Sequence, residues 1–408
     1  MENRNSVFIA MNGGFGPLAQ VMPLVDELKK HGIDIIFYNY RAAAELVKEM
    51  GFTLFEPPEE VIKPVKINPN GPEWWNADYL CSKYGFLDYE YTKYMVKVFA
   101  DAMLYYKPKA VISVMYPVAT IAAKILGLPL CSVTQACLHP KGKGGRTTWW
   151  KELPENLDRT SPVVNRILSE HGLQTIEKME ELNVCDLTIV PSIPEFDVID
   201  SCDVLYTGLM YWQGPKEILG TTFEVERKNP YLIYAYTGHM SNSNGRGTGI
   251  ILLEMILKAF NNTEFDVVVS TGTGQGGEIP EDLKTADNIT ITQWVSVNDF
   301  IPKCDIIIHH GGHGSCLQGL GHGVPSIVMP TMDEREYNAR QLVEMGVGDF
   351  IHPDEITPQS LLQKAREIVA NREMKDKATR LAQEIRNSNI DGVKEAARRI
   401  LEMIQKAD

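Results

Sequence analysis

The chain has 408 residues, of which 44% are hydrophobic and 23% are charged. This length exceeds one ordinary domain and suits two domains of about 200 residues, each with its own core. The formal net charge is -13, from 53 acidic and 40 basic side chains. That balance argues against nucleic acid and anionic membrane surfaces as partners, because both favour clustered lysine and arginine.

The cysteines and the apolar segments indicate a cellular compartment. Seven cysteines are scattered along the chain without C-x-x-C spacing, which predicts buried thiols in a reducing environment. No run of about 18 apolar residues occurs, and the first ten residues lack the apolar core and cleavage site of a signal peptide. We therefore expect a cytoplasmic protein without a membrane span.

Short apolar runs alternate with helical patterns in the first half of the chain. A helical stripe ends at Lys29–Gly32, with cations at the negative helix end and glycine beyond it. The predicted strands are 7–10, 33–38, 52–55, 110–115 and 130–133, and the predicted helices include 42–50 and 119–126. Buried parallel strands have such continuous apolar runs, so the pattern predicts a doubly wound α/β sheet.

The same alternation starts again in the second half. The predicted strands are 231–236, 266–270, 289–291, 305–308 and 326–329, and the predicted helices are 250–260, 313–321 and 336–344. The irregular residues 209–229, with their Gly-Pro and Asn-Pro pairs, are placed as the interdomain linker. A helical tail follows from residue 358, amphipathic over 390–403.

Two segments of the first half are predicted to be insertions. Residues 57–85 are rich in proline and contain Trp74-Trp75, which predicts a long loop. Trp149-Trp150 marks the second insertion. Loops of this length in a compact domain are usually functional or mobile, and their aromatic side chains suit either an apolar pocket or the core.

The segment His309–Gly323 carries the strongest functional signal. An apolar strand ends at His309-His310, a Gly311-Gly312 turn follows, and a helix begins near His313. Such a unit directs free N–H groups and about half a positive charge at whatever is bound there, which suits a diphosphate. The histidines of this segment lack the carboxylate or thiolate spacing of a metal site, so no metal is expected.

This segment and its surroundings resemble a known family. The matching motifs are His310-Gly-Gly-His-Gly-Ser, Gly323-Val-Pro, Pro330, Asp333-Glu334, Asn338-Ala339, Gly346-Val-Gly and, upstream, Gln293-Trp294-Val295. In this order they resemble glycosyltransferase family 1, the nucleotide-sugar-dependent GT-B enzymes that include bacterial macrolide and antibiotic glycosyltransferases. The likeness covers nearly the whole chain and is strongest over residues 290–350.

The resemblance implies the GT-B architecture, in which two Rossmann-like doubly wound domains face a central cleft. Residues 1–212 would form the N-terminal, acceptor-binding domain, and residues 226–385 the C-terminal, nucleotide-sugar-binding domain. Residues 386–408 would form a helix that crosses back to the N-terminal domain.

The resemblance also implies a set of donor-binding residues. His310 and Ser315 would hold the diphosphate, together with backbone N–H groups at Gly238, Gly312 and Gly314. The strand–turn–helix pattern independently favours the same place for an anion, since ligands of open α/β sheets bind at the carboxyl ends of strands.

The rest of the donor would be held by residues on either side of this turn. By resemblance, Trp294 would lie against the nucleotide base and Val295 would offer it backbone hydrogen bonds. Asp333 and Glu334 occupy the positions that usually bind sugar hydroxyls. Gln318 stands where a glutamate usually meets the ribose, and its amide still forms hydrogen bonds there.

The catalytic position departs from the family pattern. The family usually has a histidine base three residues before the first-helix proline, where this chain has Gln20, and the orienting aspartate would fall near Val114. Neither side chain takes a proton, although a general base contributes typically 10²–10⁴-fold. The substitute bases open to the chain are His139, Asp78, Asp88, His239 and the weak candidate His313. Alternatively, the acceptor is acidic or intrinsically nucleophilic and needs little help from a base.

The resemblance implies an inverting, metal-independent transfer of a sugar from a UDP- or dTDP-sugar to a small, largely apolar acceptor such as a natural-product aglycone. The nucleotide sugar would be a substrate, no cofactor is expected, and a homodimer is a possible assembly. Because Gln20 and Val114 replace the usual pair, the alternative is a non-catalytic nucleotide-sugar-binding partner or sensor of the same fold. A nucleotide-sugar epimerase with GT-B architecture is a second alternative.

Overall fold

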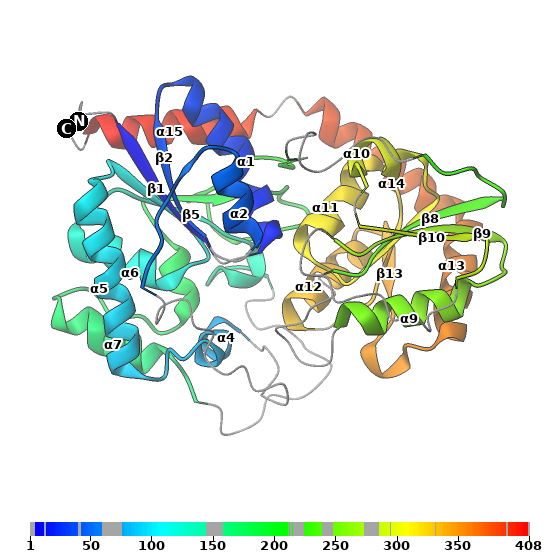
Figure 1. The fold of residues 1–408 in the computed structure, drawn as a ribbon, viewed down its shortest axis with the longest axis horizontal. Coiled ribbons are helices and arrows are strands. Elements are labelled where there is room, and N and C mark those ends of the chain that lie inside the picture. Colours follow the sequence, from blue (N-terminus) through cyan, green and yellow to red (C-terminus); the bar gives the residue numbers. More distant parts are fainter. Residues whose placement is uncertain are drawn as a thin grey trace.

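The computed structural model describes residues 5–11, 14–39, 42–58, 76–143, 158–210, 212, 214, 224–238, 248–272, 285–293, 295–330, 332–388 and 391–406. Within these residues the chain forms two parallel β-sheets that lie side by side, each covered by helices (Figure 1). The α/β prediction with two Rossmann-like sheets is confirmed. None of the described helices is long and apolar enough to cross a lipid bilayer.

The first sheet has the strand order β3-β2-β1-β4-β5-β6-β7. Its strands are β1 (Ser6–Met11), β2 (Asp34–Tyr38), β3 (Thr53–Leu54), β4 (Ala110–Val114), β5 (Leu130–Val133), β6 (Leu187–Val190) and β7 (Val204–Tyr206). The segments around them are α1 (Phe15–Lys30), α2 (Ala42–Glu49), α4 (Ala77–Lys83), α5 (Tyr89–Tyr106), α6 (Pro117–Leu126), η1 (Ala136–Leu138), α7 (Ser161–Glu170) and η2 (Met179–Asn183).

The second sheet has the strand order β10-β9-β8-β11-β12-β13. Its strands are β8 (Tyr231–Tyr236), β9 (Phe265–Ser270), β10 (Ile289–Thr292), β11 (Ile306–His309), β12 (Ser326–Val328) and β13 (Gly348–Phe350). The remaining segments are α9 (Thr248–Phe260), α10 (Val297–Phe300), η3 (Ile301–Lys303), α11 (His313–His322), α12 (Asp333–Glu344), η4 (Pro353–Glu355), α13 (Pro358–Ala370), α14 (Arg372–Asn387) and α15 (Gly392–Lys406).

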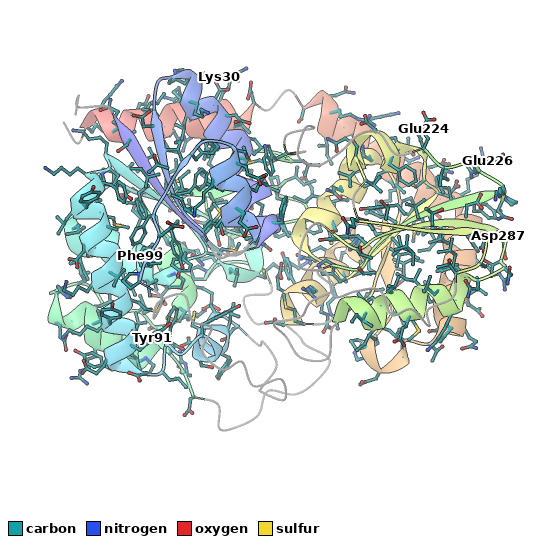
Figure 2. The ribbon with its side chains drawn as sticks, viewed as in Figure 1. Lys30, Tyr91, Phe99, Glu224, Glu226 and Asp287 are labelled. Carbon is teal, nitrogen blue, oxygen red and sulfur yellow. The ribbon has the colours of Figure 1, made fainter. Side chains whose placement is uncertain are left out.

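Alternate side chains of the central strand β1 enter two different cores. Val7 and Ile9 pack in the core that includes side chains of α1 and α15, whereas Phe8 packs in the core that includes α5 and α6. All six residues of β1 are buried, as expected for a parallel strand covered on both faces. Figure 2 shows Phe99 of α5 in the second of these cores, where its ring meets Tyr38 edge-on with centroids 4.7 Å apart.

The last helix of the chain packs on the first sheet. Ala396, Ile400 and Ile404 of α15 are buried in the same core as Val7 and Ile9 of β1. Gly392 makes this approach close, because a Cβ there would lie 2.2 Å from the Cα of Thr207. The chain therefore completes the second sheet and then returns to the first, against which the red helix α15 packs in Figure 1.

The loop predicted over residues 57–85 is partly wrong. Residues 77–83 form α4, whose first turn is capped by the side chain of Asn76, which accepts a hydrogen bond from the Tyr79 N–H. Asp78 is buried within this helix and accepts a hydrogen bond from the Ser161 N–H at 2.7 Å. Tertiary contact therefore stabilises a helix too short to be stable alone. Trp74, Trp75, Trp149 and Trp150 lie outside the described residues.

Candidate functional site

The glycine-rich segment lies at the point where the order of strand addition in the second sheet reverses. The chain builds β8, β9 and β10 outward on one side, then returns to add β11, β12 and β13 on the other. The carboxyl ends of the neighbouring strands β8 and β11 are therefore followed by divergent connections, which begin at Thr237-Gly238 and at His310. Open α/β sheets bind ligands at such switch points.

The imidazole of His310 lies between two glycines from these two connections. Gly238 has a positive φ of 79°, and a Cβ at this position would lie 3.2 Å from Nδ1 of His310. A Cβ at Gly312 would lie 2.8 Å from Nε2 of the same ring. Glycine suits both positions, because the positive φ of Gly238 disfavours other residues and a Cβ at Gly312 would force the ring of His310 to shift. The structure brings together Gly238, His310 and Gly312, three of the residues that the resemblance implies for donor binding.

Two polar contacts hold the turn itself, one from its own strand and one from α12. His309 accepts a hydrogen bond from the Gly311 N–H at Nδ1 (3.1 Å), and Asn338 donates from Nδ2 to the Gly311 carbonyl (2.9 Å). Both side chains are buried. Burial lowers the pKa of His309 to about 3, so this imidazole is neutral and serves the turn as an acceptor.

Helix α11 begins directly after this turn, with Gly312 at its N-cap. The first N–H groups of a helix have no partner within the helix, so the first turn of α11 offers donors and a positive dipole end to an anion. Gly314 is exposed, with open space where a Cβ would be, and Ser315 and Gln318 are partly buried on the same helix. This surrounding suits the diphosphate position predicted from the sequence.

Helix α12 brings charged residues to the same turn. It begins at Asp333, which is buried, and Glu334 follows in its first turn. Burial raises the pKa of Glu334, opposed by the positive charge of Arg335. A Cβ at Gly311 would lie 2.9 Å from the Cβ of Arg335, so α12 starts directly over the turn.

The two residues predicted to meet a nucleotide base lie after β10. Val295 is buried with Phe300 and Ile301, so its side chain belongs to the core and its backbone alone is available to a ligand. Trp294 lies outside the described residues. Among the described residues, no three histidine, cysteine or carboxylate side chains are grouped as metal ligands.

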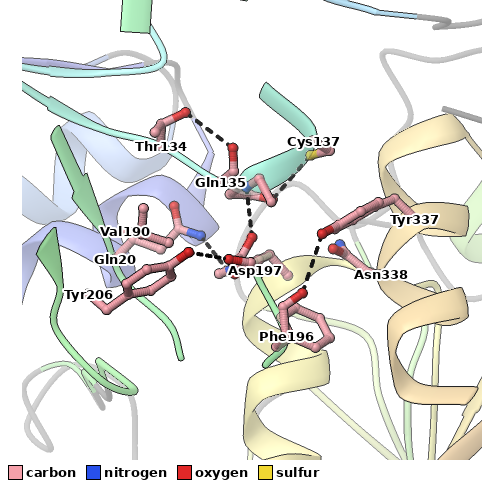
Figure 3. Close-up of polar contacts among 12 residues, drawn as sticks. Gln20, Thr134, Gln135, Cys137, Val190, Phe196, Asp197, Tyr206, Tyr337 and Asn338 are labelled. Carbon is pink, nitrogen blue, oxygen red and sulfur yellow. Dashed lines mark hydrogen bonds and ion pairs between the residues drawn. The ribbon is translucent and has the colours of Figure 1, made fainter. Parts of the chain in front are cut away.

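The first residue of α11, His313, is held by two side chains of the first half of the chain. Its Nε2 lies 2.7 Å from Oδ2 of Asp197, and its Nδ1 lies 3.0 Å from Nε2 of Gln20. Gln20 belongs to α1, and Asp197 lies between β6 and β7. Figure 3 shows Gln20, Asp197 and the neighbouring Phe196 in one close-up. All three side chains of this Asp197–His313–Gln20 chain are buried.

The hydrogen bonds define the tautomer of His313. A carboxylate only accepts hydrogen bonds, so Nε2 of His313 carries the proton that it donates to Asp197. Nδ1 then carries a lone pair, which accepts a hydrogen bond from the amide of Gln20. Burial alone would raise the pKa of Asp197, but His313 and the Ala136 N–H hold it below its usual value. Asp197 is therefore a buried carboxylate that orients the His313 ring.

Apolar packing surrounds this polar chain. Ile193 and Phe196, from the segment that leads to Asp197, are buried together with Cys316, Leu317 and Leu320 of α11. The ring of Phe196 meets that of His313 edge-on, with centroids 5.6 Å apart. The two halves of the chain are thus packed together next to the start of α11.

The other base candidates are engaged elsewhere. Asp88 caps α5 by accepting from the Tyr91 N–H, and Asp78 accepts from the Ser161 N–H. His139 accepts from the Lys141 N–H, and burial lowers its pKa to about 4. Val114 is fully buried at the end of β4, and His239 lies outside the described residues. Asp197, which contacts His313, is the site residue that sequence reasoning did not find.

The chain shares its fold with solved GT-B proteins. The calicheamicin glycosyltransferase CalG4 superposes with a TM-score of 0.72 and 18% identity, over 99% of this chain and 99% of that chain. The glycosyltransferase VinC, solved in complex with dTDP, gives a TM-score of 0.66 and 15% identity, over 98% and 100% of the two chains. The two sheets and their packing therefore define a protein of the GT-B fold.

Comparison of sequences adds partial matches to one family and its relatives. Residues 254–403 match the family described as erythromycin biosynthesis protein CIII-like, C-terminal domain. Demethyllactenocin mycarosyltransferase of Streptomyces fradiae is 29% identical over 136 residues, which are 32% of this chain and 28% of that protein. The match thus spans less than a third of the relative's length. The resemblance to macrolide and antibiotic glycosyltransferases inferred from the motifs is confirmed.

Proposed function

We propose that this protein transfers a sugar from a uridine or thymidine diphosphate sugar to a small, largely apolar acceptor such as a natural-product aglycone. The single observation that carries the proposal is the position of His310 between Gly238 and Gly312, at the sheet's switch point and before the first turn of α11. The names of the matched relatives support the reaction class.

In this proposal the diphosphate lies at the start of α11. His310 and Ser315 donate hydrogen bonds to it, and the N–H groups of the first turn add the partial positive charge of the helix. These donors stabilise the negative charge that grows on the diphosphate when it leaves the anomeric carbon. Inversion follows from direct attack by the acceptor, without a metal. The free thiols of the seven cysteines suit a reducing cytoplasm as the place of action.

Thermal unfolding with UDP, dTDP, GDP and ADP tests the donor site. A nucleotide at about 100 times its Kd adds roughly 2.7 kcal/mol to the free energy of unfolding. We expect stabilisation by UDP or dTDP in the wild type and its loss in His310→Ala. His322→Ala is the matched control, since His322 lies at the opposite end of α11 and contacts Asn298. If no nucleotide shifts the melting temperature, the proposed diphosphate site is wrong.

Product formation tests the reaction. Wild-type protein is incubated with UDP- and dTDP-sugars and a panel of macrolide, polyketide and phenolic acceptors, and glycosides are detected by mass spectrometry. A second candidate function is a non-catalytic nucleotide-sugar sensor, favoured by the amide of Gln20 at the expected base position. Tight nucleotide binding without glycoside formation on any acceptor would support the sensor and contradict the transferase.

A further inference from the structure

We propose that His313, oriented by Asp197, is the general base that accepts the proton of the acceptor hydroxyl. This inference rests on the proposed transferase function and supplies the catalytic group that Gln20 lacks. Nδ1 of His313 accepts a hydrogen bond from Nε2 of Gln20 at 3.0 Å. A base is therefore present beside the expected catalytic position, although it belongs to the opposite domain.

The geometry of the pair suits this role. Asp197 accepts the Nε2 proton of His313 at 2.7 Å and is itself held by the Ala136 N–H at 2.8 Å. The carboxylate fixes the tautomer whose Nδ1 lone pair accepts from Gln20 in this structure, and it stabilises the imidazolium that forms after proton transfer. This is the arrangement of a base and its orienting carboxylate, divided between the two halves of the chain.

The location of His313 relative to the proposed donor also fits. His313 is the first residue of α11 and directly follows Gly312, whose missing side chain makes room for the His310 ring. Glu334, which the resemblance implies as a sugar-binding residue, interacts electrostatically with His313, so the sugar of a donor held there would lie on the side of His313. None of the other described base candidates, which are Asp78, Asp88 and His139, is positioned at this helix start by the contacts that it makes.

The proposed step begins when the acceptor hydroxyl takes the position of the Gln20 amide at Nδ1 of His313. The hydroxyl oxygen bonds to the anomeric carbon while its proton passes to Nδ1. The bond from the anomeric carbon to the diphosphate oxygen breaks, and its electron pair leaves with the nucleoside diphosphate. The imidazolium of His313, paired with the carboxylate of Asp197, then releases the proton to solvent.

Other titratable groups surround this pair and bear on its pH dependence. Those that interact electrostatically with Asp197 or His313 are Glu334 of α12, Tyr337 of α12, Cys137 of η1, Cys316 of α11 and Tyr206 of β7. Glu334 is the rival base among them, because it is a carboxyl group next to the same helix start. The experiment therefore includes Glu334→Gln.

The test compares two acceptors with different need for a base. One is an alcohol from the product screen, whose hydroxyl must lose its proton during attack. The other is a nitrophenol acidic enough to be ionised at neutral pH, which needs no base. We expect His313→Gln and Asp197→Asn to lower kcat/KM for the alcohol by about 10²-fold or more, with a much smaller loss for the nitrophenol. The ascending limb of the wild-type pH–rate profile should disappear in His313→Gln.

Tyr337→Phe is the matched control for damage to the domain interface. Tyr337 donates a hydrogen bond to the backbone carbonyl of Phe196, the neighbour of Asp197, at 3.4 Å (Figure 3). Loss of this hydrogen bond should leave the ratio of kcat/KM between the alcohol and the nitrophenol unchanged. UDP binding by calorimetry identifies variants that fail to fold or to hold the donor.

Three results would overturn the inference. An equal loss for both acceptors in His313→Gln, with the pH limb retained, would make the pair a positioning device. Loss of the pH limb in Glu334→Gln, with His313→Gln still retaining it, would identify Glu334 as the base. Transfer to neither acceptor by wild-type protein that binds UDP would contradict the proposed function, and the base role with it.

Discussion

Oδ2 of Asp197 and Nε2 of His313 lie 2.7 Å apart, although 116 residues separate them in the chain. The contact joins the segment after β6 of the first sheet to the first residue of α11 beside the second sheet. Because α11 starts at the proposed diphosphate position, this hydrogen bond, like the one between His313 and Gln20, connects the proposed donor site to the domain expected to hold the acceptor. The relationship between these two side chains therefore bears on both stability and catalysis.

Removing the imidazole should destabilise the protein. His313→Ala leaves the buried carboxylate of Asp197 without its side-chain partner, so we expect a loss of about 3 kcal/mol at pH 7, measured by urea denaturation. Glu344→Gln is the control, since the Lys143–Glu344 ion pair also joins the two halves but is exposed. It should cost no more than about 1 kcal/mol. Equal losses in both variants would contradict the role given to burial.

The Asp197–His313 pair also predicts how the stability lost in His313→Ala depends on pH. The pKa of Asp197 in the folded protein is held below its usual 3.8. The stability that the ionised Asp197 contributes is therefore fully present above pH 3.8, and it is lost as the pH falls through the pKa of the folded state. The difference between wild type and His313→Ala should shrink in this acidic range. A difference that stays constant down to pH 3 would show that lost packing, rather than the charge of Asp197, causes the effect.

Acid should also destabilise the protein through His309. Its pKa is about 3 in the folded protein against 6.5 for an exposed histidine, so folding opposes protonation and stability falls as the pH drops from 6.5 toward 3. The free energy of unfolding changes through this group by at most about 1.4 kcal/mol per pH unit. His309→Asn keeps an acceptor for the Gly311 N–H but does not titrate, so its stability should fall less between pH 6.5 and 4. Comparison at pH 8 separates this effect from any change in packing.

Two glycines of α11 should respond oppositely to alanine. A Cβ at Gly319 would lie 2.7 Å from Cδ1 of Ile307 and from Oγ of Ser326, so Gly319→Ala should cost roughly 1–3 kcal/mol. Gly314 has nothing within 4 Å of a Cβ, and alanine there should stabilise the helix by up to about 1 kcal/mol. Gly314→Ala should still weaken UDP binding, if the ligand occupies that space. Melting temperature and UDP calorimetry measure the two effects.

The last helix should stabilise the first sheet rather than the second. Ile400 of α15 is fully buried with Val7 and Ile112, so Ile400→Ala should cost about 2–5 kcal/mol. Hydrogen exchange should increase in β1 and β4 and change little in β8. Glu402→Gln, in the exposed Arg398–Glu402 pair of the same helix, is the control and should leave exchange unchanged. Faster exchange confined to β8 would contradict this assignment.

Much of the framework could be predicted from the sequence. The strands expected at 130–133 and 231–236 coincide with β5 and β8, and the helix expected from His313 begins at that residue. Buried parallel strands are apolar on both faces, so they stand out as continuous apolar runs. The elements that were missed, such as α4, β6 and β7, are short, and tertiary contact rather than a strong local pattern stabilises them.

The sequence by itself determined the position of the glycine turn and its histidine. The resemblance carried by its motifs implied Gly238, His310 and Gly312 together, and the close approach of backbone and ring explains why glycine suits these positions. Only the tertiary structure showed which side chains surround Gln20, the residue at the expected base position. Gln20 meets His313 across 293 residues and His313 meets Asp197 across 116. Such partners depend on how the two domains pack, and local sequence patterns carry no information about that packing.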